Sequence, residues 1–348
     1  MKKCLSMILA LAMTVSLAAC GGDGGKQPAG GSGSNGGETK VSLNVSVPDA
    51  DNSYIYAAAQ EFKAKVEEYS GGSIELTIFP NGTLYGGDGN AAVTSVGNGS
   101  LDIVILAASM YASFDPSFFL ISVPYLFDDT KQLQDYLNSD TGKDLFNSVE
   151  SMGITCLGRW TRSFRQITNS KTPVNSPDDL KGMVLRTPSN SLYTEYFTAC
   201  GATATPMNFS EVYNALQLNT LDGQENPVDV PATNNFYEVQ KYISGTNHIA
   251  DAWVVGMNTA KLTGLSQNQQ DALRKAAEEC QQWYVDYQAE KDGEMLKLLT
   301  DNGMEYNEVP EDGFQKFVEI SQGLYPKFKE LVANDELFEA TTAFCGKS

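Results

Sequence analysis

The chain has 348 residues, with 43 acidic and 24 basic side chains and a formal net charge of −19 at pH 7. This acidic balance excludes nucleic acid as a partner, because a phosphate backbone binds to basic surfaces. The hydrophobic content of 42% is enough to build a core, and the length predicts two domains.

Residues 1–19 are predicted to be a signal peptide. Lys2 and Lys3 form a positive start, and the apolar run that follows is too short to span a bilayer. The run ends in Leu-Ala-Ala-Cys20-Gly, which resembles a bacterial lipobox, so we expect cleavage before Cys20 and lipidation of its thiol. An ordinary signal peptide with an incidental Cys20 is the alternative. Loss of Lys2 and Lys3 with the leader changes the formal charge to −21.

Residues 20–39 are predicted to be the lipidated cysteine and a flexible linker. The segment is rich in glycine and holds no apolar residue larger than Ala29, so it cannot bury enough surface to fold. The lipid and the linker together would hold the rest of the chain outside the cytoplasm and close to the membrane.

Strand and helix patterns alternate from Val41 onward. Residues 41–47 and 74–79 alternate apolar and polar side chains, which is typical of half-buried strands, whereas residues 101–106 form a nearly continuous apolar strand. Helical runs cover residues 54–69 and 90–96. The alternation predicts α/β domains with largely parallel sheets, whose ligands lie beyond the carboxyl ends of the strands.

A second long pattern begins at Ser266, a predicted N-cap, and ends at about Thr300. Its apolar side chains recur at spacings of three and four and form one stripe: Leu273, Ala276, Ala277, Cys280, Trp283, Tyr284 and Tyr287. A helix of this length, roughly 50 Å, is longer than a small domain. It must bridge two bodies, kink at Gly293 or serve a partner interface. Two helices separated at Gly293 are the alternative.

Residues with chemical reactivity are scarce. The chain has one histidine, His248, and no nucleophile motif, which disfavours a catalytic triad or a hydrolytic zinc site. No cofactor or metal is predicted, and His248 is interpreted as structural. Beyond Cys4 and Cys20, four cysteines are too widely spaced for a metal motif, and their disulfide pairing stays open: Cys156, Cys200, Cys280 and Cys345.

Arg186, just ahead of Pro188, is a local exception in an acidic chain. A guanidinium offers paired donors in a planar fork that fits a carboxylate. Arg186 is therefore a candidate for binding an anion. A structural ion pair with one of the many acidic side chains is the alternative.

Several passages of the chain carry a family resemblance. They are residues 164–170, 179–188, 201–216, 221–227, 236–242 and 246–248. Together they resemble the substrate-binding proteins of TRAP transporters, over nearly all of the chain beyond the linker.

The resemblance implies an α/β fold, a two-domain clamp of the periplasmic-binding-protein type with a long hinge-spanning helix. Residues 40–162 plus 252–291 would form domain I, and residues 163–251 plus 292–348 would form domain II. The implied function is capture of a small organic acid, such as a dicarboxylate, a uronate or another sugar acid. The receptor would pass it to TRAP transporter membrane subunits.

The resemblance also implies a set of ligand-binding residues. Arg186 matches the family arginine that pairs with the ligand carboxylate, and Arg165 matches a second arginine. Phe209 matches the aromatic residue beside the ligand, and Asn226 matches a polar contact. Residues 107–110 lack a glutamate that some sialic-acid-binding members carry, which disfavours sialic acid.

Two further candidates come from the residues alone. Trp160 either flanks the site or belongs to the core. Asp88 either accepts hydrogen bonds from ligand hydroxyls or caps the helix after it. Two other functions stay open at this point: an exported enzyme acting on an acidic sugar, and a receptor that presents its solute to a membrane sensor.

Overall fold

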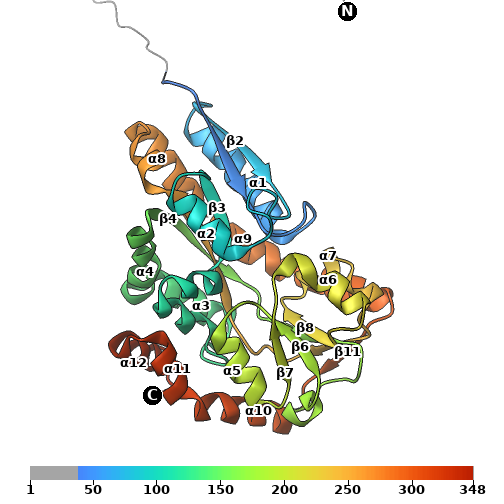
Figure 1. The fold of residues 1–348 in the computed structure, drawn as a ribbon. Helices are drawn as coiled ribbons and strands as arrows, with labels where there is room; N and C mark the ends of the chain where they lie inside the picture. Colours follow the sequence, from blue (N-terminus) through green and yellow to red (C-terminus); the bar gives the residue numbers. More distant parts are fainter. Residues whose placement is uncertain (1–37, 348) are drawn as a thin grey trace, which may run out of the picture. The chain divides into compact units, whose positions relative to one another are not determined.

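The structure, a computed structural model, describes residues 38–347, which form two β-sheets flanked by helices (Figure 1). The predicted signal peptide, Cys20 and nearly all of the linker lie outside the described residues. Among residues 38–347, no helix combines the length and the apolar character needed to cross a membrane.

Each sheet is assembled from strands that are distant in the sequence. The first sheet has the order β2-β1-β3-β10-β4: β1 (Val41–Ser46), β2 (Ile74–Phe79), β3 (Ile103–Ala107), β4 (Ile154–Arg162) and β10 (Asp251–Asn258). The second has the order β11-β9-β5-β8-β6-β7: β5 (Gln166–Asn169), β6 (Val184–Thr187), β7 (Thr203–Pro206), β8 (Gly223–Asn226), β9 (Tyr242–Gly245) and β11 (Glu305–Glu308).

The prediction of largely parallel sheets is only partly right. β10 runs antiparallel to both β3 and β4, and β5 runs antiparallel to both β8 and β9. Strands joined by a helical crossover within one sheet come out parallel. β5 and β10 have no such crossover, because each enters its sheet directly from the other sheet.

The chain passes between the sheets three times. β4 continues into β5 across residues 163–165, β9 continues into β10 across residues 246–250, and the long helix α9 (Gln267–Asp301) leads from the first sheet to β11 in the second. These crossings place functional segments of both sheets next to one another.

The remaining elements cover the sheets (Figure 1). The α-helices are α1 (Tyr54–Tyr69), α2 (Gly89–Gly97), α3 (Thr130–Asn138), α4 (Asp140–Asn147), α5 (Ser191–Ala199), α6 (Phe209–Gln217), α7 (Asp229–Thr233), α8 (Thr259–Thr263), α10 (Glu311–Gly323), α11 (Tyr325–Val332) and α12 (Asp335–Phe344). Short 3-10 helices are η1 (Ala108–Ser113), η2 (Pro116–Ser122), η3 (Ser148–Met152), η4 (Pro177–Leu180) and η5 (Phe236–Glu238).

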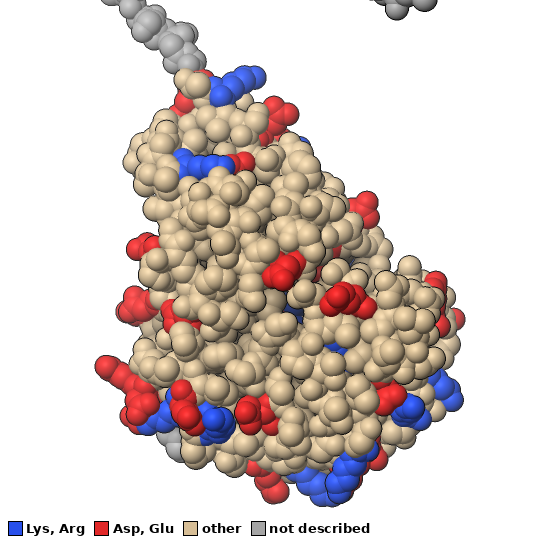
Figure 2. Space-filling model, viewed as in Figure 1, with Lys and Arg blue, Asp and Glu red and all other residues tan. Residues whose placement is uncertain are grey.

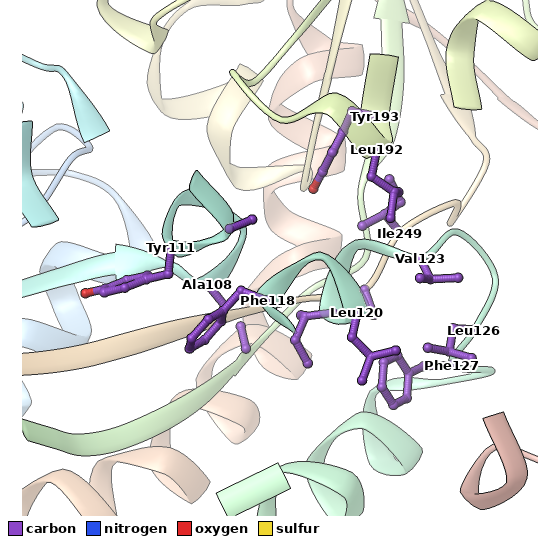
Figure 3. Packing of buried hydrophobic residues seen from close by; sticks show 14 of the residues in the cluster. Ala108, Tyr111, Phe118, Leu120, Val123, Leu126, Phe127, Leu192, Tyr193 and Ile249 are labelled. Carbon is purple, nitrogen blue, oxygen red and sulfur yellow. The ribbon is translucent and has the colours of Figure 1, made fainter. Parts of the chain in front are cut away.

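The apolar strand β3 is buried on both faces, as its sequence predicts. Ile103 and Ile105 pack into one hydrophobic cluster with α1 and α9, whereas Val104 and Leu106 pack into another. Figure 3 shows part of that second cluster, in which Tyr111 of η1 lies beside Phe118 of η2, and Leu192 of α5 lies beside Ile249. Because successive strand residues point to opposite faces, one apolar run supplies two cores.

The long helix is continuous from Gln267 to Asp301. Ser266 accepts a hydrogen bond from the backbone of Gln269, whose side chain accepts one from the backbone of Ser266, so the predicted N-cap is part of a capping box. Gly293 lies inside the helix and does not divide it. α9 contacts both sheets: its Tyr284 packs against Trp160, and its Leu299 packs with Ile243 of β9.

The four cysteines that the structure describes are buried thiols without a disulfide partner: Cys156, Cys200, Cys280 and Cys345. Burial raises the pKa of Cys156 to about 11, so this thiol is protonated at neutral pH.

Candidate functional site

A cavity lies where the edges of the two sheets face each other. Counting its opening to solvent, it has about 660 Å³ of empty space, and it is lined by residues of both sheets and of the loops that follow their strands. On the face shown in Figure 2, blue atoms of basic side chains lie at the bottom of a hollow whose rim carries acidic side chains. Small-molecule sites are commonly concave and combine apolar walls with a few polar groups.

Strand direction explains which side chains reach the cavity from the second sheet. β6, β7 and β8 are parallel, so their carboxyl ends share one edge. Arg186 lies near the end of β6, Phe209 follows β7 closely, and Asn226 is the last residue of β8. β5 is antiparallel, with Gln166 opposite Asn226, so the residue just before it, Arg165, reaches the same edge. All four predicted residues line the cavity.

Arg186 is a buried cation without a carboxylate partner. Arg186 is only 4% exposed. Its Nε and Nη2 donate to the carbonyl oxygen of Met207 at 3.0 and 2.7 Å. Within residues 38–347, these are its side-chain hydrogen bonds, and no acidic side chain lies within ion-pair distance of it. Burying an unpaired charge costs several kcal/mol, so this guanidinium favours an anionic ligand.

Burial lowers the pKa of Arg186 to about 10. The negative charge of Glu225 offsets part of this effect, and the positive charge of Arg165 adds to it. Arg186 therefore remains charged at neutral pH. Its guanidinium carbon lies 5.9 Å from the ring centre of Phe209, a cation–π contact that helps to orient it.

Arg165, in contrast, is already neutralised by the protein. It donates through Nε and Nη2 to the carboxylate of Glu225 and through Nη1 to Asp251 at 3.3 Å. Nη2 also donates to the side-chain oxygen of Asn226 at 2.9 Å. Arg165 thus holds Asn226 in place at the edge of the cavity.

His248 supports this network from behind. Its Nε2 lies 3.2 Å from a carboxylate oxygen of Glu225, and its Nδ1 lies 2.8 Å from the hydroxyl of Thr246. Burial lowers the pKa of His248, although Glu225 offsets part of the effect, so a neutral ring donates to Glu225. The position of the only histidine in the chain is structural, as its sequence context indicated.

The first sheet contributes a third arginine, Arg162, at the end of β4. It donates through Nη1 to Asp251 at 3.1 Å, and its guanidinium carbon lies 4.3 Å from the ring centre of Trp253. Both Arg162 and Trp253 line the cavity. Asp251 therefore bridges Arg162 and Arg165, which come from opposite ends of the β4–β5 crossing.

Two of the sequence-predicted candidates do not line the cavity. Trp160 is fully buried in the core between Phe62 and Tyr284, and its indole N–H donates to the carbonyl oxygen of Ala277 at 2.7 Å. Asp88 caps α2, because its carboxylate accepts from the backbone N–H groups of Asn90 and Ala91. Each takes the structural role that was its alternative.

Other lining residues were missed by sequence reasoning: Asp49, Tyr85 and Trp253. Asp49 had a usable signal, because it follows β1 closely and so lies at the carboxyl end of a strand. Trp253 had none, because its position depends on how β10 inserts between β3 and β4.

Acidic side chains also cluster beside the cavity, and nearby positive charges offset their mutual repulsion and burial only in part. Asp229 of α7 is buried, and burial raises its pKa to about 7 even though the charge of Arg162 lowers it; Asp49 and Asp292 raise it further. The unfolded chain therefore releases this proton near pH 4, whereas the folded protein holds it until about pH 7. The free energy of unfolding should fall over this interval.

Asp229→Asn should remove that pH dependence. The variant and the parent should unfold at similar temperatures at pH 4, and the variant should be more stable by roughly 2–4 kcal/mol at pH 8. Thermal unfolding at both pH values measures this, with Asp286→Asn on the exposed side of α9 as a control. A stability difference that does not change with pH would contradict the assignment.

Comparison with known families gives a match over most of the chain. Residues 45–331 match the family described as "Bacterial extracellular solute-binding protein, family 7". The 2,3-diketo-L-gulonate-binding periplasmic protein YiaO of Escherichia coli (strain K12) is 34% identical over 250 residues, which cover 72% of this chain and 76% of that protein.

Solved structures agree with this match. The sugar acid binding protein DctPAm from Advenella mimigardefordensis strain DPN7T, in complex with galactonate, has a TM-score of 0.85 and 29% identity, covering 89% of this chain and 99% of that one. A TRAP periplasmic solute binding protein from Shewanella oneidensis with bound succinate has a TM-score of 0.82 and 26% identity, covering 88% and 100%. The predicted α/β clamp with a long helix is confirmed.

Proposed function

The chain belongs to the family of bacterial extracellular solute-binding proteins, family 7, and on this premise we propose that it captures a small organic acid in the cavity between its two sheets. The members of this family bind solutes and are not enzymes, so the protein is an extracytoplasmic receptor without catalytic activity. We propose that it delivers its solute to the membrane subunits of a TRAP-type transporter.

One observation carries the proposal: Arg186 is a buried guanidinium in the cavity, with no carboxylate of residues 38–347 near enough to pair with it. A ligand carboxylate would supply the missing charge. A charge-assisted pair with a planar fork is both strong and directional. The related proteins that bind 2,3-diketo-L-gulonate, galactonate and succinate all take carboxylates, which supports the same assignment here.

The other lining residues would position the acid. Phe209 lies beside the Arg186 guanidinium and would cover one side of the carboxylate. Asn226 would offer a polar contact, held in orientation by Arg165. Arg165 itself would contribute mainly through this orientation, because its charge is already balanced by Glu225 and Asp251.

We propose that binding closes two lobes over the ligand, with residues 40–162 plus 252–291 in one lobe and residues 163–251 plus 292–348 in the other. Contacts between the sheets' loops support closure. Asn190 donates to the carbonyl oxygen of Ser109 at 3.1 Å, and a Cβ on Gly87 would lie 3.0 Å from the side chain of Ser210. A ligand that touches both sides would favour the closed form.

The N-terminal sequence supports a membrane anchor. We propose that Cys20 is lipidated and that the glycine-rich linker tethers the receptor to the membrane surface. Mass spectrometry of the N-terminal peptide from membrane fractions checks this. A diacylglycerol on Cys20 is expected, and a mature protein that begins at any other residue would contradict it.

Calorimetry with a panel of organic acids tests the binding function. We expect at least one acid to bind with a Kd of about 1 μM or tighter, which corresponds to a binding free energy of roughly −8 kcal/mol. Mass spectrometry of small molecules that co-purify with the protein would suggest members for the panel. If no carboxylate binds, the proposed function is wrong.

A further inference from the structure

The charge balance of the cavity predicts that the ligand carries one carboxylate. Three guanidinium groups line it, but Arg165 pairs with Glu225 and Asp251, and Arg162 pairs with Asp251. Of these three arginines, only Arg186 lacks an acidic partner within residues 38–347. A second carboxylate would enter the cavity without a free cation to receive it.

An acidic group also faces the cavity from the first sheet. Asp49, in the loop after β1, is 5% exposed and lines the cavity, and its Oδ2 has no hydrogen-bond partner among the described residues. Burial raises its pKa, although the charges of Arg162 and Arg165 lower it in part. An unpartnered buried acceptor is costly, and a carboxylate here would repel a second ligand carboxylate.

A hydroxyl group lines the same cavity as Asp49. Tyr85, in the loop after β2, is 8% exposed and lines the same cavity, and its phenolic oxygen also has no partner within residues 38–347. The two loops are joined by a hydrogen bond, because the backbone N–H of Asn81 donates to the carbonyl oxygen of Asp49 at 2.8 Å. After the larger effect of burial, the charge of Asp49 raises the pKa of Tyr85. A Cβ on Gly82 would lie 2.8 Å from the tyrosine ring, so a glycine at this position leaves space for the ring.

The two unpartnered groups complement each other and match a hydroxylated ligand. Asp49 can accept hydrogen bonds, and Tyr85 can both donate and accept them. Neutral hydroxyl groups would satisfy both without adding charge to the cavity. Aliphatic CH₂ groups would leave both buried and unsatisfied, which costs about 1–3 kcal/mol for each group.

We propose that the ligand is a polyhydroxylated monocarboxylate, an aldonate or a uronate, and that Asp49 and Tyr85 select it over dicarboxylates. This inference rests on the proposed function, because it requires the carboxylate to bind at Arg186. The hydroxyl groups then extend to Asp49 and Tyr85 in the loops of the first sheet. Such a ligand contacts one lobe through its carboxylate and the other lobe through its hydroxyl groups.

Calorimetry on the full mature protein tests the selection directly. The panel contains D-galactonate, D-gluconate, D-galacturonate and D-glucuronate, with hexanoate as the matched acid without hydroxyl groups and succinate as the dicarboxylate. At least one hydroxylated acid should bind about 100-fold more tightly than hexanoate and succinate, because two hydrogen-bonding groups are left unpaired by the latter two. Succinate or hexanoate binding as tightly as the best sugar acid would overturn the inference and leave the receptor function intact.

Variants separate the two parts of the site. Asp49→Asn should weaken binding of the best sugar acid by about 10- to 100-fold, and Tyr85→Phe by about 5- to 10-fold, since each removes one hydrogen-bonding group. Asp49→Asn should also narrow the gap between the sugar acid and succinate, because the repelling charge is gone. The neighbouring, exposed Asp51→Asn is the control and should bind like the parent.

Circular dichroism and thermal melting check the folding of the same samples. Asp49→Asn keeps the shape of the side chain, so its spectrum and melting temperature should stay close to those of the parent. Unchanged affinity of folded Asp49→Asn for the sugar acid would overturn the inference. If none of the six acids binds the parent protein, the proposed function is wrong together with it.

Discussion

Replacing Arg186 with alanine should weaken the binding of every carboxylate ligand by about 10²- to 10³-fold or more. The side chain holds the one guanidinium in the cavity that no carboxylate of residues 38–347 neutralises, so a bound acid would depend on it for charge balance. Calorimetry with the tightest ligand of the parent protein measures the loss. The effect should extend to hydroxylated and plain acids alike, unlike that of Asp49→Asn.

A control variant distinguishes the loss of Arg186 from the loss of any one positive charge. Arg274→Ala removes the same charge from an exposed site on α9 and should leave the affinity unchanged. Without ligand, Arg186→Met should be at least as stable as the parent, because a buried charge that lacks a partner is costly. If Arg186→Ala binds the acid as tightly as the parent, Arg186 is not the carboxylate site.

Replacing Glu225 with alanine should lower the free energy of unfolding by about 3–5 kcal/mol, because removal of one partner leaves a buried charge uncompensated. Glu225 is fully buried and accepts hydrogen bonds from Arg165 and His248. Urea unfolding at pH 7 measures the loss. Exposed Glu211→Ala on α6 should change stability by less than about 0.5 kcal/mol, and equal effects of the two variants would contradict this network.

The same network has a defined pH dependence. Burial raises the pKa of Glu225, but the charges and hydrogen bonds of Arg165 and His248 outweigh it, so the pKa lies below its ordinary value of 4.5. A carboxyl with a lowered pKa stabilises the fold above the pKa of the unfolded chain. This stabilisation is fully present above about pH 4.5 and is lost as the pH falls further.

Sequence reasoning was most successful where local pattern decides the structure. The apolar stripe and N-cap of residues 266–300 specified α9 closely, because capping and three-to-four spacing act within one helix. The alternation of short strands and helices specified β1, α1 and β2 with the predicted bounds or within one residue of them. The orientation of β5 and β10 was not predictable in this way, since it depends on crossings between distant segments.

The candidate site was predictable in part for the same reason. Arg186 stands out locally as a charged residue in a short strand before a proline, and the family resemblance added Arg165, Phe209 and Asn226. Trp160 and Trp253 lie opposite each other on β4 and β10, yet only Trp253 lines the cavity. Tertiary packing decides which of the two tryptophans lines the cavity. The residues around each tryptophan in the sequence do not contain that information.

The pairing of acidic side chains with arginines was the feature of the site that was hardest to predict from the sequence. In a chain with 43 acidic residues, any arginine has many possible partners. The sequence could not indicate that Glu225 and Asp251 neutralise Arg165 while Arg186 is left without an acid. This difference between two arginines determines the proposed charge of the ligand.

We infer that a ligand carboxylate neutralises Arg186 in the cavity between the sheets. A crystal structure of the protein with its tightest-binding acid tests it most directly. We expect a carboxylate oxygen within about 3 Å of the Arg186 guanidinium. A ligand whose carboxylate binds elsewhere, or an Arg186 side chain paired with an acidic residue of the protein in that complex, would contradict it.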